Sequence, residues 1–184
     1  MPSVFASEIK SGRFTLLAAL TVEPKLSPSG ELARAFEAHH ALVFRTAYRI
    51  TGNAADAEDV LQTIFLRLVG RPERNAVGNE ESYLRRAAVN ASLDLLRARR
   101  EDHEAEPDDI PSGAPAPDAG ELRAALRRAL GRLNPKSAEI FSLRFFEGFS
   151  NQEIAHLLGI SRVLVAVIVH RARRQLQHEL RDYR

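Results

Sequence analysis

The feature that most constrains the fold is an acidic, proline-rich stretch at residues 101–120, EDHEAEPDDIPSGAPAPDAG. It holds four prolines, two glycines and seven acidic residues, and it has no lysine or arginine. A segment with this much charge and so few large apolar side chains cannot bury a core. We therefore expect an acidic flexible linker that separates residues 31–100 from residues 121–184 and leaves residues 1–30 as an unassigned N-terminal extension.

Both blocks have the apolar periodicity of helices. In the first block, apolar residues recur every three or four positions, which predicts helices over residues 32–50, 56–69 and 80–100, with a loop at 70–79. In the second block, the same period and the capping residues predict helices over residues 122–133, 137–146 and 154–158, and a last helix from Ser161. The predicted fold class is therefore all-α, with two small helical domains: an N-terminal bundle of three or four helices and a C-terminal helix-turn-helix domain.

Composition argues against several classes of site. The chain has no cysteine, which excludes disulfides and thiolate metal sites. Its six histidines do not form a metal-binding set, and neither a phosphate-binding glycine loop nor a nucleophile motif is present. No apolar run approaches the roughly 18 residues of a membrane span. We therefore expect no catalytic residue, no metal, no cofactor and no membrane insertion, and a cytoplasmic location.

The end of the second block has the signals of a helix-turn-helix. Ser150 and Glu153 form a capping-box pattern, Gly159 suits a left-handed helix end, and Ser161 suits the start of the next helix. In such a unit the second helix lies in the DNA major groove. Residues 121–184 carry twelve lysines and arginines against six acidic residues, which favours DNA as the partner over a plain helical hairpin.

The last helix is unusual because residues 163–169, VLVAVIV, are all apolar. At helical spacing Val165, Val169, Ala172 and Leu176 face inward, and the outer stripe consists of Val163, Leu164, Val167 and Ile168. The outer stripe has no hydrogen-bond donor, so its side chains cannot make bidentate contacts to base edges. It is either a partner surface, as exposed apolar patches often are, or a surface that touches thymine methyl groups.

Several motifs resemble those of bacterial RNA polymerase sigma factors of the sigma-70 family, extracytoplasmic-function (ECF) group. Residues 133–176 resemble the promoter-binding region 4, through motifs that include Phe141-x-Leu143-Arg144, Glu147-Gly148-Phe149-Ser150 and Leu158-Gly159-Ile160-Ser161. Residues 52–68, GNAADAEDVLQTIFLRL, resemble region 2, and residues 82–100, SYLRRAAVNASLDLLRARR, resemble its helix that melts the −10 promoter element.

This resemblance implies a transcription initiation factor, not an enzyme, that docks on core RNA polymerase and reads two promoter elements. It implies polymerase binding by an acidic helix start, with Asp56, Glu58, Asp59 and Gln62. It implies −10 DNA binding in residues 31–100 by Tyr83, Arg85, Arg86, Asn90, Arg97, Arg99 and Arg100. It implies −35 DNA binding in residues 121–184 by Ser161, Arg162, His170, Arg171, Arg173 and Arg174.

The chain departs from the family pattern at three places. Thr63 follows Gln62 where the family usually has an acid, Tyr83 is the nearest aromatic residue where the family often has tryptophan, and the outer stripe replaces polar reading residues. Two functions therefore stay open: a promoter-specificity factor with relaxed −35 readout, or a sigma-like interaction protein that binds polymerase or an anti-sigma factor. A general helix-turn-helix repressor would not explain residues 52–68.

Overall fold

The computed structural model describes residues 28–69, 80–103 and 119–183. The predictions for residues 1–27, for the loop at 70–79 and for residues 104–118 of the linker lie outside these ranges.

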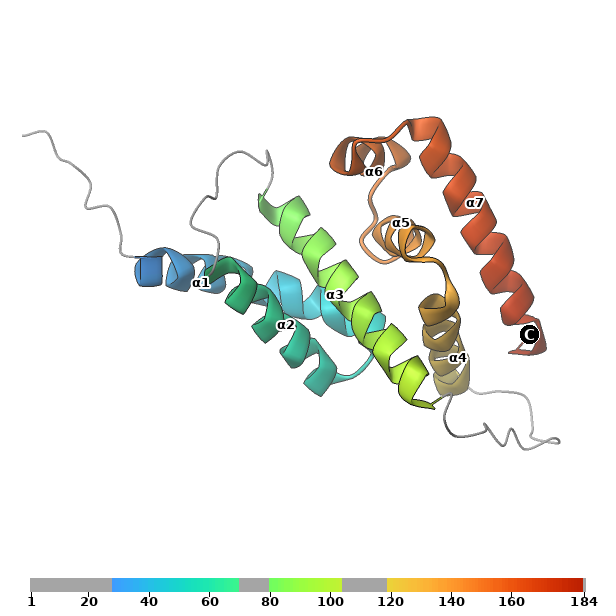
Figure 1. The fold of residues 1–184 in the computed structure, drawn as a ribbon, viewed down its shortest axis with the longest axis horizontal. Helices are drawn as coiled ribbons and strands as arrows, with labels where there is room; N and C mark the ends of the chain where they lie inside the picture. Colours follow the sequence, from blue (N-terminus) through green and yellow to red (C-terminus); the bar gives the residue numbers. More distant parts are fainter. Residues whose placement is uncertain (1–27, 70–79, 104–118, 184) are drawn as a thin grey trace, which may run out of the picture.

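The described part of the chain is all-α, as the periodicity predicts, and it forms two groups of helices (Figure 1). The N-terminal group consists of α1 (Pro28–Thr51), α2 (Ala54–Val69) and α3 (Glu80–His103). The C-terminal group consists of α4 (Ala119–Arg132), α5 (Pro135–Phe145), α6 (Asn151–Leu158), α7 (Arg162–Glu179) and a short 3-10 turn, η1 (Arg181–Tyr183).

The N-terminal group is a three-helix bundle, because each helix presents one apolar face to a shared core. That core includes Leu42, Val43 and Ala47 of α1, Val60, Ile64 and Phe65 of α2, and Leu84 and Ala88 of α3. The turn between α1 and α2 uses Gly52, whose φ of 67° lies in the left-handed region that favours glycine.

Helix caps set the boundaries of the C-terminal group. The Asn134 side chain accepts a hydrogen bond from the Ser137 amide (2.9 Å), and Pro135 begins α5. At the start of α6 the predicted capping box is confirmed: the Glu153 amide donates to the Ser150 hydroxyl (3.2 Å), and the Ser150 amide donates to the Glu153 carboxylate (2.7 Å). The Ser150 hydroxyl, and after it the Ser150 amide, stabilise the charged carboxylate by hydrogen bonding and so lower the pKa of Glu153.

The two groups pack directly against each other along α3. Figure 1 shows α3 between the α1–α2 pair and the C-terminal helices. One hydrophobic cluster joins Ile50, Val89 and Leu93 of the N-terminal group to a C-terminal set that includes Leu130 and Ile140. The sequence predicts both groups of helices, but it does not predict this contact between them.

No described helix is by itself long and apolar enough to span a membrane. Helices α6 and α7, which meet at a bend of 111°, reach the length and apolar composition of a membrane span only when they are taken together.

Candidate nucleic-acid interface

The turn between α6 and α7 is fixed by backbone geometry and by a buried plug. Gly159 ends α6 with a φ of 64°, and the Ile160 amide donates to the carbonyl of Ala155 (3.0 Å). The Ser161 hydroxyl caps α7 by accepting from the Leu164 amide (3.2 Å). Val165 is fully buried in the angle between the helices, as its place on the inner stripe predicts. The helix-turn-helix geometry is therefore built as the sequence indicates.

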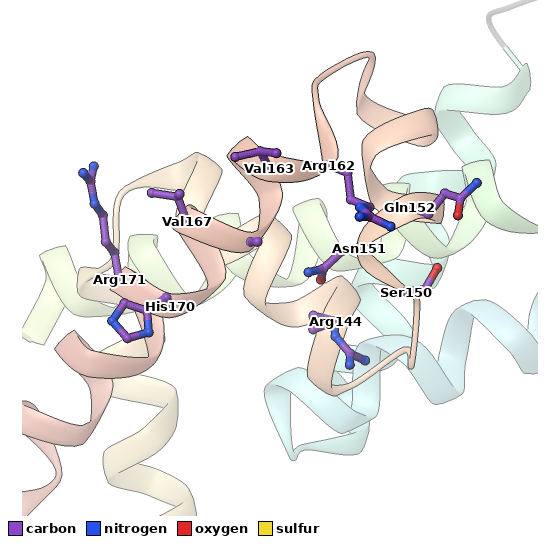
Figure 2. A pocket seen from close by; sticks show the side chains of 10 residues that line it. Arg144, Ser150, Asn151, Gln152, Arg162, Val163, Val167, His170 and Arg171 are labelled. Carbon is purple, nitrogen blue, oxygen red and sulfur yellow. The ribbon is translucent and has the colours of Figure 1, made fainter.

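An open groove of about 780 Å³ runs along this unit. Figure 2 shows Arg144 of α5 and the polar residues that start α6 beside one side of α7. The groove is lined by Arg144, Ser150, Asn151, Gln152, Arg162, Val163, Ala166, Val167, His170 and Arg171. The lining combines three arginines, Arg144, Arg162 and Arg171, with an apolar floor of Val163, Ala166 and Val167. Such a surface suits nucleic acid, because the arginines can bind phosphates and the apolar side chains can contact the groups between them.

The structure divides the outer stripe of α7. Val163 and Val167 line the groove, and Leu164 is exposed outside it. Val163 is 72% exposed, which is the highest exposure among the large apolar side chains that the structure describes. Ile168 differs from these three residues because it is only partly exposed and packs against the hydrophobic cluster of the C-terminal group.

The basic residues predicted for −35 binding also fall on more than one face. Arg162, His170 and Arg171 line the groove together with the apolar floor. Arg173 instead borders a second cavity, whose lining includes Leu122 and Phe141. Arg174 is exposed and lines neither of these cavities.

Sequence reasoning did not assign Arg144, Asn151 or Gln152 to this groove. Arg144 is held in place because it donates to the carbonyl of Phe149 (3.4 Å) and lies 5.9 Å from the centre of the Phe145 ring. Its position in the Phe141-x-Leu143-Arg144 motif was the available signal. Asn151 and Gln152 lie inside the capping box, whose pattern predicts only the start of a helix.

The residues of α3 predicted to bind −10 DNA are mostly held by carboxylates. Arg85 donates to Glu147 (2.6 Å) and to Glu81 (2.6 Å). Arg86 and Asn90 both donate to Glu139, at 2.7 and 3.2 Å. Farther along α3, Arg97 pairs with Asp94, Arg99 pairs with Asp56, and Arg100 also has an interaction partner. Tyr83, in the first turn of α3, is half-buried against the N-terminal core.

Two of the charged groups in these contacts, Arg85 and Glu139, have shifted pKa values. Burial alone would lower the pKa of Arg85, but the hydrogen bonds to Glu81 and Glu147 outweigh burial, so this pKa is raised. Burial alone would raise the pKa of Glu139, but hydrogen bonds from Arg86 and Asn90 outweigh it, so this pKa is lowered. Both groups are therefore firmly charged at neutral pH.

The acidic start of α2 separates into buried and exposed residues. Asp56 is only 2% exposed, and its carboxylate accepts from Arg99. Glu58, Asp59 and Gln62 are exposed and available to a partner. Leu66, one turn after Gln62, is 71% exposed and was not identified from the sequence.

Within the described residues, no group of three or more histidine, cysteine or acidic side chains is placed to hold a metal ion.

Two family matches fall on the two groups of helices. The family described as "Sigma-70 region 2" matches residues 35–101, and the family described as "Sigma-70, region 4" matches residues 123–176. The first match covers most of α1–α3, and the second covers most of α4–α7.

Curated relatives are similar over most of the chain. The "ECF RNA polymerase sigma factor SigE" of Mycolicibacterium smegmatis is 37% identical over 153 residues, covering 79% of this chain and 58% of that protein. The "RNA polymerase sigma-E factor" of Streptomyces coelicolor is 35% identical over 142 residues, covering 75% of this chain and 79% of that protein. "ECF RNA polymerase sigma factor SigL" of Mycobacterium tuberculosis (strain ATCC 25618 / H37Rv) is 33% identical over 159 residues, covering 80% of this chain and 87% of that protein.

Among solved structures, the Mycobacterium tuberculosis extracytoplasmic function sigma factor SigJ matches with a TM-score of 0.45 and 24% identity, covering 79% of this chain and 53% of that one. Because both conserved regions match in order, and because relatives more than 30% identical align over most of their own length, the chain belongs to the sigma-70 family, in the ECF group of RNA polymerase sigma factors.

Proposed function

We propose that this sigma factor directs core RNA polymerase to promoters, with α2 docking on the polymerase, α3 engaging the −10 element and α6–α7 binding the −35 element. The observation that carries the proposal is the pair of family matches, which fall in order on the two groups of helices. We place the boundaries of the region 2-like domain at residues 31–100 and those of the region 4-like domain at residues 121–184.

The exposed face of α2 supports the docking role. Glu58, Asp59 and Gln62 are exposed and lie within about one turn of each other, so they can meet a basic partner surface. Leu66 adds a large exposed apolar group to the same helix. A partner that pairs with the acids and buries Leu66 would gain about 1.5–3 kcal/mol from that one leucine.

The groove of α6–α7 supports binding to duplex DNA by phosphate contacts. Arg144, Arg162 and Arg171 surround it, and its apolar floor offers no side-chain donor to base edges. Affinity should therefore fall steeply with salt, by about 0.9 log unit per log unit of salt for each phosphate contact. Discrimination between promoter and random duplex should be below about 10³, the lower end of the range for specific DNA-binding proteins.

An anti-sigma factor is a further expected partner, and the cytoplasm is the expected location. The exposed apolar residues Val163, Leu164 and Val167 favour a second candidate function, in which the chain binds polymerase or an anti-sigma factor without reading the −35 element. The two functions differ in whether the chain supports promoter-specific initiation.

Run-off transcription with purified core polymerase tests the proposal. The full-length chain should start transcription at promoters that core polymerase alone ignores. A variant with Glu58→Lys and Asp59→Lys should lose this activity, because like charges would face the basic partner. Glu37→Lys, an exposed charge change on α1, is the matched control and should retain it. Unchanged activity in the α2 variant would refute the docking site, and no initiation by the wild type would favour the second candidate function.

A further inference from the structure

The groove of α6–α7 contains one side chain whose charge can change near neutral pH. Of the ten described residues that line it, three are arginines, which stay charged, and six have side chains that do not titrate. The tenth is His170. Histidine ordinarily gains or loses a proton between about pH 5 and 8, so the groove has a fourth cation only when His170 is protonated.

His170 continues the groove-facing side of α7 beyond the apolar floor. Val163, Val167 and His170 are spaced by four and three residues, so they lie on one face of the helix, and all three line the groove (Figure 2). The floor has no polar side-chain atom, and His170 is the first hydrogen-bonding side chain that follows it along α7. The residue is exposed to solvent. A duplex that lies on the floor therefore reaches this imidazole.

The groove offers a protonated His170 no anionic partner among the described residues. The charged side chains that line the groove with it are Arg144 of α5 and Arg162 and Arg171 of α7, and α6 contributes only uncharged polar residues. Arg174, one turn along α7, is a further cation. His170 itself makes no hydrogen bond or ion pair within the described part of the chain. A counter-charge for its imidazolium therefore has to come from a bound molecule.

Duplex DNA can supply this counter-charge. Phosphates close to an imidazole favour its charged form, and the charged ring donates from both nitrogens, whereas the neutral ring donates from one. The three arginines of the lining can hold the phosphate backbone near the histidine. DNA binding and protonation of His170 should therefore favour each other, because coupling between two binding events is reciprocal.

We propose that His170 is a proton-dependent DNA contact, so that the chain takes up a proton at this residue when a duplex enters the groove. Because the bound state then holds more protons than the free state, affinity for DNA falls as the pH rises. The DNA-binding groove thereby responds to pH through a single side chain. This inference rests on the proposed −35 role of α6–α7.

The test is binding of the full-length chain to a fluorescein-labelled duplex of random sequence and about 20 base pairs, which is about two turns of DNA. Affinity is measured at fixed salt from about pH 6 to about pH 8, within the range in which histidine changes charge. An opposite charge nearby favours a charged form by about tenfold or more, so the wild type should lose at least about fivefold in affinity across this range.

Two substitutions at His170 should flatten the pH profile at opposite levels. His170→Gln removes the titrating group and should bind at every pH as weakly as the wild type does at the alkaline end. His170→Arg fixes the charge and should bind at every pH at least as tightly as the wild type does at the acidic end. His156→Gln and His178→Gln are the matched controls and should keep the wild-type profile, because both histidines are exposed and line neither the groove nor the second cavity. Unfolding curves should be unchanged for all four variants, as is usual for surface substitutions.

Salt dependence and proton uptake are two further readouts that a merely structural role of His170 would not change. The log–log salt slope of the wild type should be steeper at the acidic end by up to about 0.9, the contribution of one phosphate contact in duplex DNA. Each His170 variant should have the same slope at both ends. Calorimetry in two buffers of different ionisation enthalpy should show uptake of about half a proton per bound duplex by the wild type near neutral pH, and none by His170→Gln.

Equal affinity of the wild type at both ends of the pH range would overturn the proton-dependent contact, as would a His170→Gln variant that keeps the wild-type profile. Loss of the profile in His156→Gln or His178→Gln would also overturn it, because the proton would then bind elsewhere. These outcomes leave the proposed −35 role intact, since DNA still binds. If neither the wild type nor His170→Arg binds duplex DNA at any pH, the −35 role itself is wrong and the His170 contact is refuted with it.

Discussion

Two aspartates in the first turns of α2 have the same predicted role in the sequence but different surroundings in the structure. Asp56 is 2% exposed and paired with Arg99, whereas Asp59 is exposed. We compare Asp56→Ala with Asp59→Ala. The first change should destabilise the fold and spare polymerase docking, and the second should do the reverse.

The magnitude for Asp56→Ala follows from its surroundings. A hydrogen bond to a charged group contributes about 1.5–3 kcal/mol, and an acid at a helix start contributes about 0.3–1 kcal/mol. Two facts reduce the net loss: the Arg99 side chain is 52% exposed and can return to water, and the Oδ2 atom of Asp56 is buried with no hydrogen-bond partner among the described residues. We expect a net loss of about 1–2 kcal/mol, which lowers Tm by about 2–8 °C in a chain of this size.

The assays are thermal unfolding and capture by core polymerase, with the two variants measured in parallel. Asp59→Ala should change the free energy of unfolding by less than about 0.5 kcal/mol, as surface substitutions usually do. If Asp56→Ala unfolds at the wild-type temperature, the buried pair does not stabilise the protein and the reasoning is wrong. If Asp59→Ala keeps full polymerase affinity even when combined with Glu58→Ala, the docking face lies elsewhere.

Three further predictions follow from single positions. Gly159→Ala should cost about 1–2 kcal/mol by denaturant unfolding, because its φ of 64° strains any residue with a Cβ although no atom lies within 4 Å of that position; a cost near zero would contradict this. Val165→Ala should cost about 2 kcal/mol in the same assay, because the side chain is fully buried. The pKa of Glu139 is lowered in the folded chain, so its ionised carboxylate stabilises the fold above its ordinary pKa of about 4.3. This stabilisation is lost as the pH falls through the lowered value. Glu139→Gln should therefore flatten this part of the curve of unfolding free energy against pH.

Helix boundaries in the C-terminal group could be predicted because their signals are local. The capping box joins Ser150 to Glu153, and the left-handed turn depends on Gly159 alone. Asn134 and Pro135 start α5 through contacts within three residues. Each of these interactions is encoded within one turn of the chain, so the residue types and their spacing are sufficient to find it.

The contact between the two groups could not be predicted, because its partners are far apart in sequence. Arg85 and Glu147 are separated by 62 positions, and Arg86 and Glu139 by 53. Their charges suit solvent, DNA or each other equally well. The same limit applies to Asp56, because nothing near it in the sequence indicates that Arg99, 43 positions away, will cover it.

The apolar run of α7 shows a further limit of sequence patterns. When seven consecutive residues are apolar, periodicity no longer identifies the inner face, and the assignment depends on the helix starting at Ser161. That start places Val165 and Ala172 in the core, as the structure confirms. It does not reveal that Ile168 also packs against the cluster while Val163 and Val167 line the groove.

The last prediction concerns this groove and its apolar floor. Val163 and Val167 offer methyl groups and no hydrogen-bond donor, so the feature of a base that they can contact is the C5 methyl of thymine. Burying one such methyl is worth about 0.8 kcal/mol, or about fourfold in affinity. A duplex selected from a random pool by the full-length chain should therefore lose about fourfold to fifteenfold in affinity when uracil replaces its thymines.

The matched variants separate DNA contact from docking on a protein. Val163→Ser with Val167→Ser should bind the thymine and uracil duplexes equally, whereas Leu164→Ser, an exposed residue outside the groove, should still distinguish them. If the stripe instead docks on another protein chain, uracil should have no effect, and Val163→Ser and Leu164→Ser should both weaken association in sedimentation. A wild type that is monomeric, binds no partner and tolerates uracil without loss would leave both uses of the stripe refuted. Contact with thymine is the favoured use of the stripe, because three arginines line the same groove as the two valines. An apolar protein partner would have to desolvate these three charges without compensation, whereas DNA can pair each of them with a phosphate.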